Sequence, residues 1–86
     1  MPWEQLRELF PITREKIYLF NGNIIPCATP VRRAMEMFLD EWTRTGDGCW
    51  ASGLEAYVEA KRLFAELIHA APETLVGIAN TTTGIN

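Results

Sequence analysis

The chain has 86 residues, enough for one small domain that is only marginally able to bury a core of its own. Its composition, with 48% hydrophobic and 22% charged residues, excludes a chain that is disordered throughout. A net charge of −3 argues against a nucleic-acid binder, which needs a basic face, and no apolar run approaches the ~20 residues that span a bilayer. We therefore expect neither nucleic-acid nor membrane partners.

The N-terminus and the two cysteines favour a reduced, cytoplasmic protein. Met-Pro-Trp-Glu-Gln lacks the basic and apolar regions of a signal peptide. Cys27 and Cys49 are too few for a disulfide framework, and neither has a histidine or a second cysteine at metal-ligand spacing. We expect both to pack as ordinary thiols, with no metal site.

The first 23 residues predict a short helix, a short strand and a turn. Apolar residues recur at helical spacing from Trp3 to Phe10, and Pro11 ends that pattern. Ile17-Tyr18-Leu19-Phe20 is rich in β-forming residues, which predicts a strand near 17–20. Asn-Gly-Asn at 21–23 then predicts a tight turn, because these residues tolerate positive φ.

Residues from about 30 to 45 predict an amphipathic helix. Thr29 can cap it and Pro30 suits its first position. One face is apolar and the opposite face is charged, with expected ion pairs Arg32–Glu36 and Asp40–Arg44 and a solvated surface. Gly46-Asp47-Gly48 predicts the end of the helix. The apolar stripe consists of Val31, Ala34, Met35, Phe38, Leu39 and Trp42.

A second amphipathic helix is predicted from about 53 to 69. Ser52 and Glu55 form a capping-box pattern at its start, and Pro72 limits its end. Lys61 falls on the edge of the apolar side, where its stem can lie along the surface with the ammonium in water, so we assign it no catalytic role. The apolar side consists of Leu54, Tyr57, Val58, Phe64, Leu67 and Ile68.

The C-terminal residues predict a buried strand followed by an anion-binding turn. Leu75-Val76-Gly77-Ile78-Ala79 is an unbroken apolar run, typical of a parallel strand near 75–79. Its neighbouring strands are absent from this chain, unless Ile17–Phe20 supplies one. The threonines from Thr81 to Thr83 then offer hydroxyl donors at an expected helix start, where free N–H groups favour anions. The Walker A pattern is absent. Alternatively, Thr82 or Thr83 is simply the N-cap.

Three segments in this order resemble the beginning of class V aminotransferases, the fold type I group that includes cysteine desulfurases, kynureninases and isopenicillin-N-epimerase-like proteins. They are Tyr18-Leu19-Phe20-Asn21-Gly22-Asn23-Ile24, the helix from Pro30 to Thr45, and Leu75 to Asn86. Asn80-Thr81-Thr82-Thr83-Gly84-Ile85-Asn86 after an apolar strand is similar to the family's Gly-Ala/Thr-Thr-Glu-x-x-Asn turn. The resemblance runs from about Phe10 to Asn86.

The resemblance implies a pyridoxal-phosphate enzyme that acts on an amino acid, by transamination, desulfuration, epimerisation or a related reaction, and that forms a homodimer. The residues that match Thr81 and Thr82 hold the cofactor phosphate in the family, and the loop matching Asn21, Gly22 and Asn23 lies near the substrate side. The expected fold is accordingly an α/β fragment. Residues 1–86 would be one incomplete N-terminal segment of such a transferase, without a second domain.

Three departures from the family pattern bear on function. Thr83 stands where the family often has Glu. His69 stands where the family usually ends a helix with Gly, and we expect it to terminate the helix because His tolerates left-handed φ. The family's lysine that carries the cofactor as a Schiff base, and the acid that pairs with the pyridine nitrogen, have no match, since Lys16 and Lys61 lie outside such motifs.

We therefore assign no catalytic residue within this chain and expect it to be inactive by itself. A rival hypothesis is a non-catalytic helical interaction module, in which the two amphipathic helices pair with each other or with a partner and the threonine-rich end is a tail. The same helices serve both hypotheses, so they do not discriminate between them.

Overall fold

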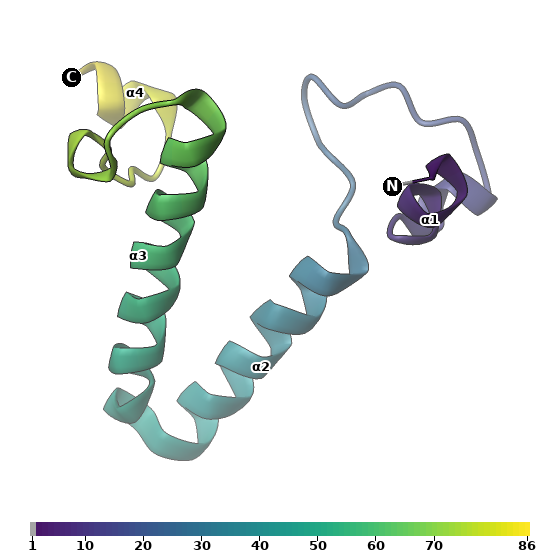
Figure 1. Cartoon of the computed structure of the whole chain (residues 1–86). Helices are drawn as coiled ribbons and strands as arrows, with labels where there is room; N and C mark the ends of the chain where they lie inside the picture. The colour runs from purple at the N-terminus through teal and green to yellow at the C-terminus, as the bar shows by residue number, and fades with distance from the viewer. Residues whose placement is uncertain (1) are drawn as a thin grey trace. The chain divides into compact units, whose positions relative to one another are not determined.

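The computed structural model describes residues 2–86, which form two compact units (Figure 1). The first unit ends at Gly46 and the second begins at Asp47. The first holds α1 (Trp3–Glu8), the 3-10 helix η1 (Pro11–Arg14) and α2 (Thr29–Thr45). The second holds most of the 3-10 turn η2 (Gly46–Gly48), then α3 (Cys49–Ile68), the 3-10 helix η3 (Pro72–Thr74) and α4 (Thr81–Ile85).

The expected α/β class is wrong, because residues 2–86 contain helices and no strand. The segments near 17–20 and 75–79, predicted as strands, are irregular. A strand directs its N–H and C=O groups sideways and needs a neighbouring strand to pair them. Leu75 does adopt an extended backbone, with φ −107° and ψ 145°. β-Forming composition therefore sets a local conformation here without the pairing that would make a sheet.

Backbone and side-chain hydrogen bonds hold the first unit together. The hydroxyl of Thr13 donates to the carbonyl oxygen of Phe10 over 2.9 Å, which fastens η1 to the residue before it. The N–H of Thr29 donates to the carbonyl oxygen of Leu9 over 2.9 Å. This second bond joins the end of α1 to the start of α2, although 20 residues separate them in sequence.

The amphipathic helix predicted from about 30 to 45 is confirmed as α2, but its predicted cap is wrong. Ala28, not Thr29, is the N-cap, and its carbonyl oxygen accepts from the N–H of Arg32 over 3.0 Å. Thr29 makes no side-chain cap bond because it is already the first helical residue. At the other end Gly46 has φ 61°, a conformation that Gly adopts without steric cost, so the predicted stop is confirmed.

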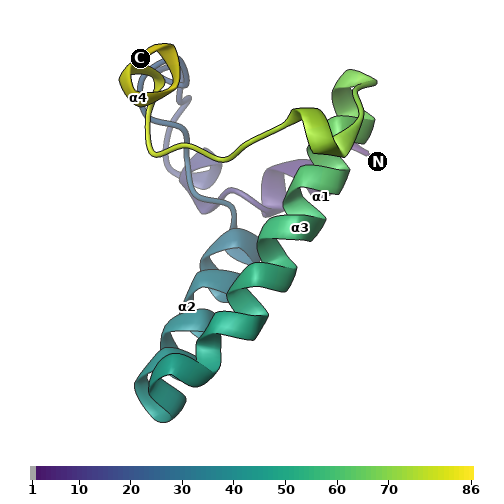
Figure 2. The ribbon, with the colours of Figure 1, turned by 90° about the vertical axis from the view of Figure 1, so that its left-hand side faces the viewer.

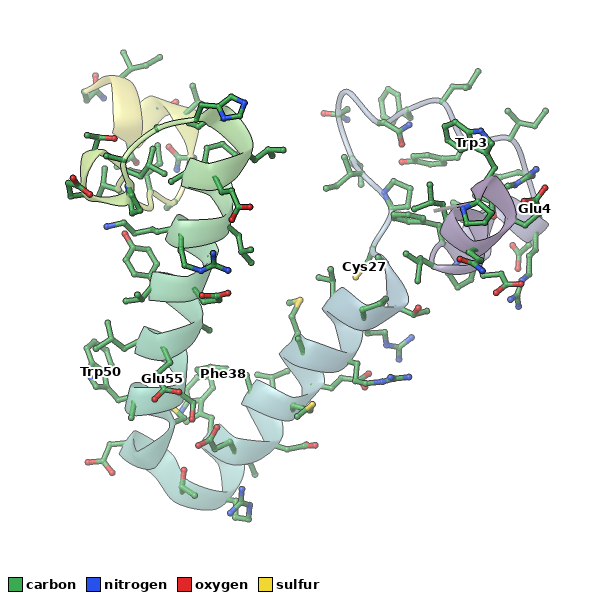
Figure 3. The ribbon with its side chains drawn as sticks, in the orientation of Figure 1. Trp3, Glu4, Cys27, Phe38, Trp50 and Glu55 are labelled. Atoms are coloured by element: carbon green, nitrogen blue, oxygen red, sulfur yellow. The ribbon has the colours of Figure 1, made fainter. Side chains whose placement is uncertain are left out.

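The apolar stripe of α2 lies open to solvent in the described structure. Its large members are exposed by 39% at Phe38 to 60% at Met35, and Figure 3 shows Phe38 projecting from the helix. On the charged face, the Arg32 guanidinium lies 2.8 Å from the Glu36 carboxylate, as predicted. The predicted pair Asp40–Arg44 is not among the ion pairs of residues 2–86.

The amphipathic helix predicted from about 53 to 69 is confirmed as α3, which starts earlier than expected. The capping box at Ser52 is wrong, since Ser52 lies within the first turns of a helix that begins at Cys49. Gly48 has φ −61° and ψ −20°, so helical backbone continues from η2 into α3. Each residue added to an existing helix gains a backbone hydrogen bond, which outweighs a new start at a favourable cap.

Arg62 links two acids on the exposed side of α3. Its guanidinium contacts the Glu59 carboxylate at 2.8 and 2.7 Å and the Glu66 carboxylate at 3.2 Å. The hydrogen bond from Arg62 lowers the pKa of Glu59 below its ordinary value. These groups are solvated, so the pairs support the helix only modestly.

His69 ends α3 in the left-handed conformation, as predicted. Its φ is 56° and its ψ 43°. The N–H of Ala70 donates to the carbonyl oxygen of Ala65 over 2.8 Å, and the N–H of His69 donates to that of Glu66 over 3.3 Å. This is the Schellman arrangement, which satisfies carbonyl groups that the helix end leaves without partners. Ala65 beneath it is 1% exposed.

Replacing His69 tests this helix end. A left-handed backbone costs an L-residue roughly 1–2 kcal/mol, and Gly avoids that cost. We expect His69→Gly to stabilise the last turn of α3 by up to about 1 kcal/mol, and His69→Val to destabilise it by at least as much. Amide exchange at Ala70 measures both. Slower exchange in the valine variant than in the glycine variant would contradict the assignment.

Little of the apolar surface is covered in either unit. Ala65 is the one buried hydrophobic residue among residues 2–86. Leu6, Phe10, Ile12 and Tyr18 in the first unit are half-buried. Within the same range, no helix is both long and apolar enough to cross a membrane.

Candidate functional site

The threonine-rich turn forms the first residues of α4. Asn80 is its N-cap, with an extended backbone (φ −163°, ψ 169°) and a side-chain oxygen that accepts from the N–H of Thr83 over 2.8 Å. The helix start predicted after the apolar run is therefore confirmed. The alternative that Thr82 or Thr83 is the N-cap is wrong, because Asn80 takes that position and is among the strongest N-cap residues.

This cap leaves two backbone donors at the start of α4, at Thr81 and Thr82. The first N–H groups of a helix have no acceptor in the preceding turn. Here Thr83 donates to Asn80 Oδ1, and Gly84 donates to the carbonyl oxygen of Asn80 over 3.2 Å. The N–H groups of Thr81 and Thr82 therefore remain without a helical acceptor, beside two exposed hydroxyls. These are the two residues predicted to hold a phosphate.

Two glycines allow close contacts around the segment before the turn. A Cβ on Gly77 would lie 2.6 Å from Cε2 of Tyr57, and one on Gly84 would overlap with Cδ1 of Ile78. The N–H of Gly77 also donates to the Tyr57 hydroxyl over 2.7 Å. Tyr57 in α3 thus contacts the segment that leads to Thr81, although nothing in the sequence spacing predicts that pair.

A hollow of about 200 Å³ lies between α3 and this segment. Its walls include Tyr57, Lys61, Phe64 and Leu75. Lys61 Nζ lies 5.6 Å from the centroid of the Tyr57 ring, within the range of a cation–π interaction. The side chain of Lys61 is half-buried, which agrees with a stem that lies along apolar surface.

The predicted turn at residues 21–23 is confirmed, and it borders a second hollow of about 410 Å³. Asn21 lies on the wall of this hollow with Phe10, Tyr18 and Ile25, whereas Gly22 and Asn23 do not line it. The N–H groups of Asn23 and Ile24 donate to the carbonyl oxygen of Phe20. None of the turn residues needs positive φ, contrary to the reason for which the sequence predicts a turn.

The Tyr18 hydroxyl closes this turn by donating to the carbonyl oxygen of Ile24. Asn21 belongs to the first unit, whereas Thr81 and Thr82 belong to the second. The substrate-side role of Asn21 and the phosphate role of Thr81 and Thr82 therefore stay predictions.

The two cysteines are free, Cys27 exposed just before α2 (Figure 3) and Cys49 half-buried at the start of α3. Within residues 2–86, no group of three or more His, Cys, Asp or Glu side chains could hold a metal ion. The described residues therefore offer the threonine-rich turn, rather than a metal centre, as the candidate site.

Comparison with known proteins identifies one related protein over the full length of the chain. The chain is 32% identical over 90 aligned residues to a protein of Methanothermobacter thermautotrophicus described as a "probable cysteine desulfurase". The chain is therefore similar to part of this relative. The match covers 100% of this chain and 22% of the relative, which is consistent with a fragment of that family and confirms the resemblance predicted from sequence. No family model matches the chain, and no solved structure matches it significantly.

The chain spans about a fifth of the relative's length. Asn80 and Tyr57 are the residues around the site that the sequence analysis missed. Asn80 carried a usable signal, because Asn followed by a helix start favours an N-cap. Tyr57 carried none, since its partner lies 20 residues further on.

Proposed function

We propose that this chain is part of a pyridoxal-phosphate-dependent enzyme that acts on an amino acid, and that Thr81 and Thr82 hold the cofactor phosphate. The observation that carries the proposal is the cap at Asn80, which leaves the N–H groups of those two threonines directed to an outside acceptor. The relation to a probable cysteine desulfurase supports the class of enzyme.

The donors at the turn suit a phosphate. Two N–H groups and two hydroxyls can each donate to a phosphate oxygen, and the dipole at the start of α4 adds a modest favourable field. No carboxylate stands in the turn from Asn80 to Gly84, so no negative side chain within it opposes the anion. The residues present therefore fit a phosphate group.

When bound, pyridoxal phosphate supplies an electron sink for reactions at the α-carbon of an amino acid. The part of this chain is to bind and orient. Thr81 and Thr82 would hold the phosphate end of the cofactor. Asn21, Gly22 and Asn23 would line the substrate side, with Asn21 offering an amide at the edge of the apolar hollow. Desulfuration, transamination and epimerisation all remain compatible with these roles, as does a homodimer.

The cofactor-carrying lysine of the family has no match here, which leads to a first test. We expect the 86-residue chain to retain no stoichiometric pyridoxal phosphate after dialysis and to show neither transaminase nor desulfurase activity. Contacts to the phosphate alone would bind the cofactor weakly. Lys61 lies against Tyr57 on α3 and not in the threonine-rich turn, so we do not expect it to carry the cofactor. The measurement is the visible absorption of the dialysed protein. A stable stoichiometric band in the dialysed wild-type chain would contradict this expectation.

The alternative is a non-catalytic helical module, and the open apolar stripe of α2 is the observation that favours it. A stripe of that kind serves equally for packing inside a larger enzyme. The nucleotide sequence that follows the last codon separates the two proposals. An open frame that encodes a lysine after a Ser- or His-rich turn would support the enzyme, whereas a stop codon with no such frame would support the module.

A further inference from the structure

Tyr57 makes the contact that joins the middle of α3 to the segment before the threonine-rich turn. Its hydroxyl accepts from the N–H of Gly77 over 2.7 Å, across 20 residues of sequence. The fit is close, because a Cβ at position 77 would lie 2.6 Å from Cε2 and 3.2 Å from the hydroxyl oxygen of Tyr57. A larger residue at position 77 would therefore push the Tyr57 ring aside.

The neighbours of Tyr57 hold its ring in this place. Lys61, one turn further along α3, sets its ammonium 5.6 Å from the ring centroid. Phe64 and Leu75 border the same hollow, and Leu75 is half-buried there. The phenol is thus supported by α3 on one side and by residues 75–77 on the other.

Beyond Gly77 the chain departs from α3. Figure 2 shows the connection leading from η3 away from the axis of α3 to α4, which stands apart from that helix. The residues between η3 and α4 therefore decide where α4 lies relative to α3. Ile78, the next residue, continues the contact, since its Cδ1 packs directly against Gly84 of α4.

We propose that Tyr57 is a positioning residue for the turn that carries Thr81 and Thr82. Its hydroxyl fixes Gly77, and Gly77 and Ile78 together set the place of α4. The functional meaning of this contact rests on the proposed phosphate role of the turn, but the contact itself does not. Tyr57 touches neither cofactor nor substrate in this account and acts through Gly77 alone.

Tyr57→Phe removes the hydroxyl and keeps the ring, and amide hydrogen exchange in the 86-residue chain reports the result. A neutral hydrogen bond is worth about 1 kcal/mol, so the Gly77 amide should exchange about fivefold faster. The Thr83 and Gly84 amides, bonded to Asn80, should also exchange faster, because the tether that orders α4 is lost. The Ala70 amide, bonded to Ala65 at the end of α3, should keep its wild-type rate.

Tyr18→Phe is the matched control, because it removes a hydroxyl that bonds to Ile24 in the other unit. It should leave Gly77, Thr83 and Gly84 unchanged. An unchanged Gly77 rate in Tyr57→Phe overturns the proposal. The proposal is also overturned if exchange becomes faster at the Gly77 amide alone, because α4 then does not depend on the contact. It is overturned as well if exchange at the Ala70 amide becomes faster by the same factor, because that result means a general loss of stability.

Inorganic phosphate supplies the functional readout and separates this inference from the proposed function. The Thr81 and Thr82 amide resonances should shift when phosphate is added. If the hydrogen bond from Gly77 to Tyr57 contributes about 1 kcal/mol to binding, half-saturation in Tyr57→Phe should require an about fivefold higher phosphate concentration than in the wild type. Equal half-saturation in both proteins would overturn the positioning role. Absence of any shift in the wild type would count against the phosphate site, while the exchange rates would still decide the role of Tyr57.

Discussion

Thermal unfolding of the 86-residue chain is expected to be broad, and the chain is expected to associate with itself. Ala65 is the one buried hydrophobic residue among residues 2–86, and the large side chains of the α2 stripe are each at least 39% exposed. Cooperative unfolding requires a packed core, and exposed apolar surface favours association. Circular dichroism melting and sedimentation at several concentrations measure the two effects.

A pair of variants tests whether the α2 stripe causes the association. Leu39 belongs to the stripe, whereas Met37 is equally part of α2 but lies off it, 65% exposed. If Leu39 is buried on association, Leu39→Gln should weaken it roughly ten- to hundredfold, from about 1.5–3 kcal/mol for a buried leucine. Met37→Gln should have little effect. A sharp, cooperative melt of a clean monomer would contradict the whole expectation.

Thr82→Val should weaken pyridoxal phosphate binding in the complete enzyme roughly ten- to hundredfold. A hydroxyl that donates to a charged acceptor contributes about 1.5–3 kcal/mol, and each 1.4 kcal/mol is a factor of ten. The variant keeps the β-branched shape, and its backbone N–H still donates, so part of the affinity survives. Cofactor dissociation, measured at equal folded fraction, tests this.

The matched control is Thr43→Val, which removes a hydroxyl from an exposed position in α2. It should bind the cofactor as the wild type does. If Thr82 serves only the packing of α4, Thr82→Val would lower the melting temperature and leave cofactor affinity unchanged. That outcome would remove the phosphate role from Thr82.

The sequence predicts the helices of this chain well, because their signals are local. The apolar spacing within residues 30–45 and the glycine at position 46 locate α2 to within a residue. At the end of α3, a histidine in a place that favours Gly indicates the left-handed residue that the structure has at His69. Capping is less predictable. Several neighbouring residues can serve as the N-cap of one helix. The N-caps of α2 and α3 are Ala28 and Gly48, whereas the sequence predicted Thr29 and Ser52.

The two wrongly predicted strands show that local sequence signals do not determine whether a strand finds a pairing partner. Residues 17–20 and 75–79 have the composition of strands, yet a strand exists only when another pairs with it. The candidate site also has a part that the local sequence predicts and a part that depends on packing. The helix start at Thr81 is predictable from the local sequence, and the phosphate role of Thr81 and Thr82 stays a prediction from the family resemblance. The contact between Tyr57 and Gly77 depends instead on how α3 and the following segment pack.

Comparison of pyridoxal phosphate with pyridoxal tests the central claim most directly. The two ligands differ only in the phosphate, so measuring both with wild type and Thr82→Val isolates the interaction between that phosphate and the Thr82 hydroxyl. In the complete enzyme we predict a loss of roughly ten- to hundredfold for pyridoxal phosphate and a change within about twofold for pyridoxal. An equal loss for both ligands, or no loss for either, would contradict the assignment of the phosphate to this turn.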